Sequence, residues 1–130
     1  MAKVTRQIRI AIESNTGGSG KTTLATHLAY GLGKKGYKVV LIDLDPNGSL
    51  GLFTGKVITP TREESLASVL DSGFQGNYPL APIWQDYVDG VQVIQGGAPL
   101  EEVIRSLHLY ERKYEILKDR LEDYPLMQKL

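Results

Sequence analysis

The first part of the chain alternates apolar with other residues and then becomes rich in glycine. Isoleucine occupies every second position from Ile8 to Ile12, which predicts a strand over about residues 7–14. Residues 15–20 follow as a glycine-rich run, and glycine accepts backbone angles that other residues avoid. The pattern therefore predicts a strand that ends in a loop of unusual conformation.

The next two apolar segments predict a helix and a second strand. Leu24, Leu28 and Leu32 recur at helical spacing, so we expect a helix over 21–35 with the leucines on one face. Residues 39–42 form an uninterrupted, β-branched apolar run, which suits a strand covered on both faces in a parallel sheet. Strand, helix and strand in this order form a βαβ unit.

The remaining pattern predicts a short helix, a third strand and a long helix. Residues 61–64 have the composition of a capping box, and the apolar residues behind them predict a short helix up to Leu70. Residues 72–89 contain several glycines and prolines and are expected to be irregular. Residues 91–94 predict a strand, and 99–123 predict one amphipathic helix. The apolar stripe of that helix comprises Leu100, Val103, Ile104, Leu107, Tyr110, Tyr114, Leu117 and Leu121.

Composition places the chain among ordinary globular domains. It has 130 residues, of which 42% are hydrophobic and 23% are charged, and this length suits one small domain. The absence of cysteine excludes disulfide frameworks, thiolate metal sites and cysteine nucleophiles. The formal net charge of zero argues against a wholly basic nucleic-acid binder. The sequence has neither a signal peptide nor a run long enough to span a bilayer, so we expect a cytoplasmic protein without a membrane span.

The segment between the first strand and the first helix has the chemistry of a phosphate site. Backbone N–H groups of a glycine-rich loop and a helix N-terminus both favour a polyphosphate. A lysine can reach the β- and γ-phosphates, and a neighbouring threonine can bind Mg²⁺. The alternative is a flexible glycine-rich turn that binds nothing, and the lysine–threonine pair between a strand and a helix disfavours it. The candidate residues are Gly17, Gly18, Ser19, Gly20, Lys21, Thr22 and Thr23.

Two carboxylates follow the second predicted strand. Asp43 and Asp45 come directly after the apolar run, and ligands of open α/β sheets bind at the carboxyl ends of the strands. One carboxylate can hold a water of the Mg²⁺ shell, and the other can orient a water in line with the γ-phosphate. Alternatively, the carboxylates cap the following loop, because Asp-Pro and Asn-Gly are turn formers. This alternative applies most to Asp43.

With both motifs in place, the sequence resembles the ParA/MinD family of deviant Walker A ATPases. The usual family segments, N-Q-K-G-G-V-G-K-T-T and D-x-D-P-Q-G, stand here as residues 14–23 and 43–48. The resemblance implies an α/β P-loop NTPase fold with a parallel sheet flanked by helices. It also implies that Lys21 binds the nucleotide, that Thr22 is a Mg²⁺ ligand and that Asp43 assists at the metal. Asp45 would position the hydrolytic water.

The chain departs from this family in two respects. Thr16 occupies the position of the signature lysine, which in the family reaches across an ATP-sandwich dimer to the phosphates of the partner. The carboxysome-positioning branch similarly lacks that lysine. In addition, no Walker B strand follows the last predicted helix. We therefore expect residues 1–130 to be the N-terminal part of a single P-loop ATPase domain, with the missing strand supplied by a longer protein or by a partner chain.

The resemblance implies a partition ATPase that uses ATP and Mg²⁺, releases ADP and cycles between a monomer and an ATP-sandwich homodimer. Such a protein would position plasmids, chromosomes or a protein cargo on the nucleoid. It would bind non-specific DNA through the missing C-terminal half and work with a ParB-like or cargo adaptor protein. Two alternatives stay open: a small-molecule kinase or ligase of the same broad group, and a truncated nucleotide-binding regulator that does not hydrolyse ATP.

Overall fold

The computed structural model describes residues 21–45, 48, 60–108 and 111–126. The predicted strand over 7–14 and the glycine-rich run over 15–20 lie outside the described residues. None of the described helices is both long enough and apolar enough to cross a bilayer. The described elements are α1 (Lys21–Lys34), β1 (Val39–Ile42), α3 (Ala67–Leu70), β2 (Ala81–Pro82), β3 (Val91–Ile94), α4 (Ala98–Ser106) and α5 (Lys113–Asp123).

The described strands form a mixed sheet in the order β1-β3-β2. β1 and β3 are parallel, with Val39 opposite Val91 and Ile42 opposite Ile94, which confirms both predicted strands and agrees with the parallel arrangement expected of the sheet. β2 is antiparallel to β3 and lies within a segment predicted to be irregular. Its two residues are too few for a period-2 pattern, and its proline is tolerated because the strand is at the edge.

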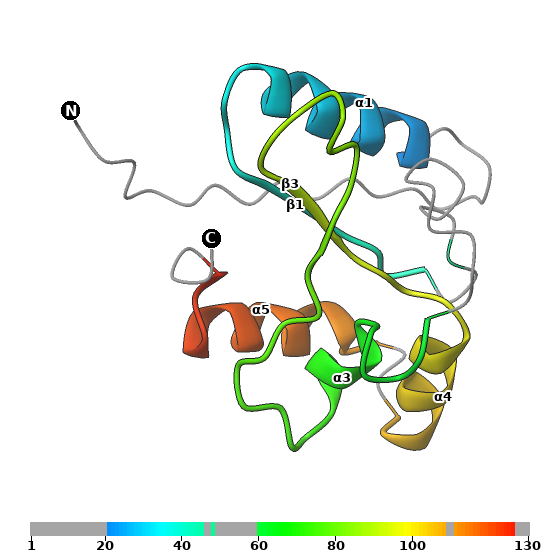
Figure 1. The fold of residues 1–130 in the computed structure, drawn as a ribbon. Helices are drawn as coiled ribbons and strands as arrows, with labels where there is room; N and C mark the ends of the chain where they lie inside the picture. Colours follow the sequence, from blue (N-terminus) through cyan, green and yellow to red (C-terminus); the bar gives the residue numbers. More distant parts are fainter. Residues whose placement is uncertain (1–20, 46–47, 49–59, 109–110, 127–130) are drawn as a thin grey trace.

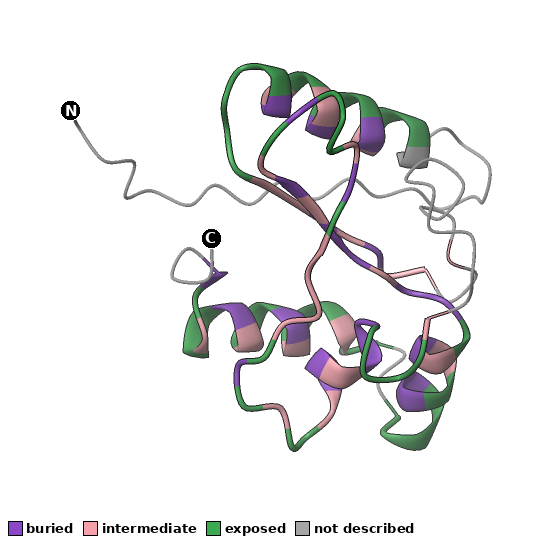
Figure 2. Cartoon of the chain, viewed as in Figure 1, coloured by how far each residue is buried: buried purple, intermediate pink, exposed green. Residues whose placement is uncertain are grey.

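Helix α1 covers one face of the sheet, and α3, α4 and α5 lie on the other side (Figure 1). The bounds of α1 agree with the predicted helix, but its orientation differs from the leucine pattern. Leu24 and Leu28 are 58% and 39% exposed, whereas Ala29 is buried. The reason is a close approach: a Cβ added at Gly33 would lie 2.5 Å from Cγ2 of Val91. Small residues therefore face the sheet, and the outer side of α1 is exposed (Figure 2).

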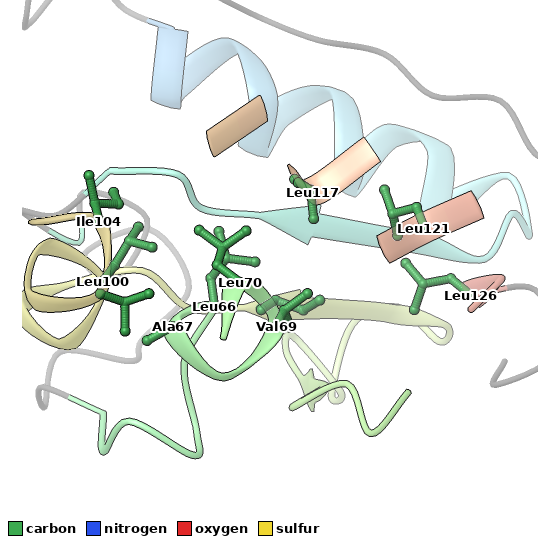
Figure 3. Close-up of a cluster of buried hydrophobic side chains, with 11 residues drawn as sticks. Leu66, Ala67, Val69, Leu70, Leu100, Ile104, Leu117, Leu121 and Leu126 are labelled. Atoms are coloured by element: carbon green, nitrogen blue, oxygen red, sulfur yellow. The ribbon is translucent and has the colours of Figure 1, made fainter. Parts of the chain in front are cut away.

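The short helix α3 is at the centre of the larger hydrophobic cluster. Thr61 donates its backbone N–H to Oε1 of Glu64 at 3.0 Å, which is one of the two hydrogen bonds of a capping box, and this hydrogen bond lowers the pKa of Glu64. The predicted cap does not start the helix, however, because α3 begins at Ala67 with Leu66 as its N-cap and no side-chain cap. Side chains from α3, α4 and α5 converge on one region (Figure 3). The buried cluster consists of Leu66, Ala67, Val69, Leu70, Ile94, Leu100, Val103, Ile104, Leu117, Leu121 and Leu126.

The predicted single helix over 99–123 is wrong, because the chain forms two helices there. α4 ends at Ser106, and His108 adopts a left-handed φ of 54°. A straight helix over 99–123 would be about 37 Å long, and only part of it could contact a helix as short as α3. The break allows both α4 and α5 to pack on α3. Two members of the predicted stripe, Leu107 and Tyr114, are consequently exposed.

Candidate functional site

The predicted phosphate site is only partly within the described residues. Residues 17–20 lie outside them, whereas Lys21, Thr22 and Thr23 form the first turn of α1. Figure 1 shows this end of α1 at the same edge of the sheet as the carboxyl ends of β1 and β3. The backbone therefore brings the start of α1 to the edge where ligands of α/β sheets bind.

Asp43 and Asp45 lie at that same edge, immediately after β1. The backbone N–H of Asp43 donates to the carbonyl of Ile94 at 3.0 Å, so the segment continues the pairing of β1 with β3. Asp43 is buried, with 6% of its surface exposed, and Asp45 is half-buried. A buried carboxylate at a strand end needs polar partners, and binding sites commonly hold such groups.

Asp43 also caps the turn that follows it. Its Oδ1 accepts a hydrogen bond from the backbone N–H of Asp45 at 3.0 Å, which is the local geometry of an Asx turn. Turn capping, the alternative that the sequence left open for Asp43, is therefore what one of its two carboxylate oxygens does. The capping contact also sets the direction in which the chain leaves β1 toward Asp45.

The adjacent glycines Gly96 and Gly97, which the sequence did not mark as site residues, contact this carboxylate segment. Gly97 donates its backbone N–H to the carbonyl of Asp45 at 3.0 Å, and Gly48 donates to the same oxygen at 3.0 Å. Gly96, which is adjacent, is buried against the backbone of the same segment. The available signal was a Gly-Gly pair one residue after a predicted strand, because glycines near a strand mark close backbone approaches.

The carboxylate pair is compatible with Mg²⁺ in the presence of a nucleotide. Among the described residues, no group of three histidine, aspartate or glutamate side chains could hold a metal ion. Mg²⁺, however, is usually bound through one or two carboxylates together with substrate phosphates and water. Asp43 and Asp45 carry carboxylate oxygens of the kind that such a site requires.

Comparison with known proteins identifies the family. Residues 7–125 match the AAA_31 family, which is described as an AAA domain. The chain belongs to this family. The match covers both segments that carry the proposed chemistry, including the residues before α1 that lie outside the described part of the chain.

Several relatives of known sequence are ParA proteins. The chain is 35% identical over 116 residues to the chromosome partitioning protein ParA of Caulobacter vibrioides, covering 87% of this chain and 41% of that protein. It is 34% identical over 85 residues to the protein ParA of Rhizobium radiobacter, covering 65% and 36%. The chain is thus ParA-like, and it spans less than half the length of these relatives.

Solved structures give the same fold. An apo McdA from Cyanthece superposes with a TM-score of 0.69 at 25% identity, covering 88% of this chain and 42% of that one. A cobyrinic acid a,c-diamide synthase from Mycobacterium smegmatis, with a bound ATP analogue and magnesium, gives 0.67 at 25% identity, covering 85% and 43%. The predicted α/β P-loop NTPase fold is confirmed.

Proposed function

We propose that this chain binds Mg–ATP at the carboxyl edge of the sheet and hydrolyses it as part of a ParA-type partition ATPase. The observation that carries the proposal is the fixed Asp43–Asp45 segment at the end of β1, at the same edge as the start of α1. The family match over residues 7–125 supports it. Residues 1–130 would be the N-terminal part of a single ATPase domain.

Each residue at this edge has a separate role in the proposal. Backbone N–H groups of Gly17 to Gly20 would surround the phosphates, and Lys21 would neutralise the charge that develops on them. Thr22 and Asp43 would hold Mg²⁺, which neutralises phosphate charge when bound. Asp45 would accept a hydrogen bond from the attacking water and orient it toward the γ-phosphate.

The test of these roles uses two substitutions, of which one should remove ATP binding and the other should leave it in place. Lys21→Ala should abolish ATP binding, because no other side chain in the proposal neutralises the β- and γ-phosphates. Asp45→Ala should retain binding and lose turnover. Calorimetry with Mg²⁺ and ATP, and phosphate release, measure the two quantities on the protein in its native length. Lys118→Ala and Asp119→Ala, on the exposed side of α5, are matched controls that should leave both quantities unchanged.

Two results would contradict the proposal. If the unsubstituted protein binds no adenine nucleotide, the proposal fails at its first step. If both substitutions remove binding equally, the division of roles between Lys21 and Asp45 is wrong. Binding without turnover in the unsubstituted protein would favour a nucleotide-binding regulator that does not hydrolyse ATP.

For the whole protein we infer a role of the kind that its ParA relatives are named for. It would position plasmids, chromosomes or a protein cargo, with a ParB-like or cargo adaptor and non-specific DNA as partners. ATP would support an ATP-sandwich homodimer, and ADP would be released on return to the monomer. DNA and adaptor together should raise ATP turnover without any small-molecule acceptor.

A second candidate function has one specific observation in its favour. The superposition on a cobyrinic acid a,c-diamide synthase indicates that the same fold occurs in an enzyme named for amide synthesis. In that case ATP would be a substrate consumed together with a small acceptor. ATP turnover that depends on a carboxylate acceptor, and is insensitive to DNA, would favour this candidate over partition.

A further inference from the structure

The turn after β3 has a backbone conformation that only glycine adopts readily. Gly97 has φ 97° and ψ −167° and precedes the first residue of α4. This combination lies in a region of backbone space that is essentially restricted to glycine. Its carbonyl accepts the N–H of Leu100 at 3.0 Å, so the turn also sets the start of α4.

The same turn holds the carboxylate segment through backbone hydrogen bonds. The carbonyl of Asp45 accepts from both Gly97 and Gly48, each at 3.0 Å, and Asp43 donates to the carbonyl of Ile94 at 3.0 Å. A Cβ on Gly48 would lie 3.5 Å from Cα of Gly97. The segment after β1 is thus attached to the end of β3 at both of its carboxylate-bearing residues.

No space remains for a side chain at position 96. A Cβ there would lie 2.5 Å from the carbonyl oxygen of Asp45, 2.8 Å from that of Asp43 and 3.2 Å from Cγ of Asp43. Two of these atoms belong to the backbone of the carboxylate segment, so they cannot yield by a change of rotamer. An alanine at position 96 would therefore displace the segment itself.

We propose that Gly96 and Gly97 are positioning residues that fix Asp43 and Asp45 relative to the nucleotide. This inference rests on the proposed ATPase function. The glycines would not touch ATP, and their effect would pass through the backbone of Asp43–Asp45. Because the phosphates are bound mainly by residues 17–22 in the proposal, a displaced Asp45 should impair turnover more than binding. Displacements of about 1 Å at a catalytic group can cost roughly 100-fold in rate.

The test compares Gly96→Ala and Gly97→Ala with a glycine that flanks the other end of β3. Gly90 precedes β3 at its other end, has φ 78° and would place a Cβ 3.3 Å from Cδ of Lys38. Gly90→Ala should therefore introduce a positive-φ strain like that of Gly97→Ala, away from the carboxylate edge. In the protein at its native length, kcat should fall roughly 10- to 100-fold in both test variants, with Kd for ATP changed less than about 3-fold. Gly90→Ala should lower the melting temperature and leave kcat unchanged.

Both test variants are also made in a Gly31→Ala background, because an added Cβ at that exposed helical position meets no atom within 4 Å and alanine there gains up to about 1 kcal/mol of helix propensity. The stabilised background should show the same selective loss of kcat, and it keeps the test decisive if the single alanine variants do not fold. Unchanged kcat in the folded variants, parallel loss of kcat and ATP binding, or equal loss in Gly90→Ala would each overturn the inference. Absence of ATP binding by the unsubstituted protein would instead overturn the proposed function.

Discussion

Asp71, which ends α3, shows how one exposed carboxylate stabilises a turn in this chain. Its Oδ1 accepts the backbone N–H of Gly73 at 2.9 Å, and its Oδ2 pairs with the guanidinium of Arg62. The hydrogen bond from Gly73, followed by the contacts with Arg62, lowers the pKa of Asp71. The ionised carboxylate is therefore bound more favourably in the folded chain than in the unfolded chain.

This lowered pKa predicts a pH-dependent contribution to stability. Because the folded pKa is below the unfolded value of about 3.9, ionised Asp71 stabilises the fold above that pH, and the contribution is lost as pH falls through the folded pKa. The neutral isostere Asp71→Asn should therefore be less stable than the unsubstituted chain at pH 7. The gap should be below about 1 kcal/mol, because the ion pair is exposed, and it should close under acid conditions.

Urea unfolding at neutral and acid pH measures this gap. Asp119→Asn, on the exposed side of α5, serves as the control and should show no such gap at neutral pH. A difference between Asp71→Asn and the unsubstituted chain that stays constant across the pH range would contradict the assignment of the gap to the charge on Asp71.

At the scale of elements, the sequence pattern predicts those helices and strands whose formation depends on residues close together in the chain. The bounds of α1, β1 and β3 agree with their patterns because each has a clear period or an unbroken apolar run. The break between α4 and α5 is not visible in the pattern, because apolar residues keep a spacing of three or four across it. What decides the break is the position of α3, whose contacts with both helices are tertiary.

The orientation of α1 is likewise decided by tertiary contacts. Sequence periodicity favours the leucine face, but burial follows Ala29 and Gly33, where the helix approaches β3 closely. A close approach requires small side chains at the contact, and a count of apolar residues gives them little weight. Larger leucines on the outer side are compatible with that approach because they do not separate the helix from the sheet.

Two glycines of α1 provide a direct test of this packing. Gly31 has no atom within 4 Å of an added Cβ, whereas Gly33 would place its Cβ 2.5 Å from Cγ2 of Val91. Both alanine substitutions gain helix propensity of up to about 1 kcal/mol, so their difference isolates the steric effect. Gly31→Ala should stabilise the chain, and Gly33→Ala should be less stable than Gly31→Ala by about 1–3 kcal/mol.

Denaturant unfolding of the two variants measures that difference. The relevant quantity is the change in the free energy of unfolding, with the dependence on denaturant concentration unchanged. If Gly33→Ala is as stable as Gly31→Ala, then α1 does not approach β3 as closely as the structure indicates, and the exposure of Leu24 and Leu28 loses its explanation.

At the scale of the molecule, the candidate site combines segments of different predictability. The sequence places Asp43 and Asp45 at a carboxyl edge because they directly follow an apolar run. It does not reveal that Gly96 and Gly97 support them, because that contact joins residues about fifty positions apart and depends on the parallel pairing of β1 with β3. The position of the two carboxylates can therefore be predicted from the sequence, whereas the glycines that contact them are found only once the strand order is known.

The largest-scale prediction concerns self-association, which the proposed ATP sandwich requires. Thr16 in place of the signature lysine removes one charge that would cross to the phosphates of a partner, but it leaves Lys21 and the carboxylates of each chain. The dimer should therefore form when ATP is bound and persist when hydrolysis is blocked. Asp45→Ala is the appropriate variant because it should bind ATP without turnover.

Sedimentation or light scattering with Mg–ATP measures the result on the protein in its native length. Asp45→Ala should show about twice the monomer mass with ATP and the monomer mass with ADP, because only the γ-phosphate distinguishes the two ligands and its charge is what a sandwich would neutralise. Lys21→Ala should remain monomeric with either nucleotide, since it should bind neither. A monomer mass for Asp45→Ala at an ATP concentration that calorimetry shows to be saturating would refute the sandwich dimer. That result would leave the proposed ATP binding intact. The absence of a lysine at position 16 would then be the most direct physical cause of the missing dimer.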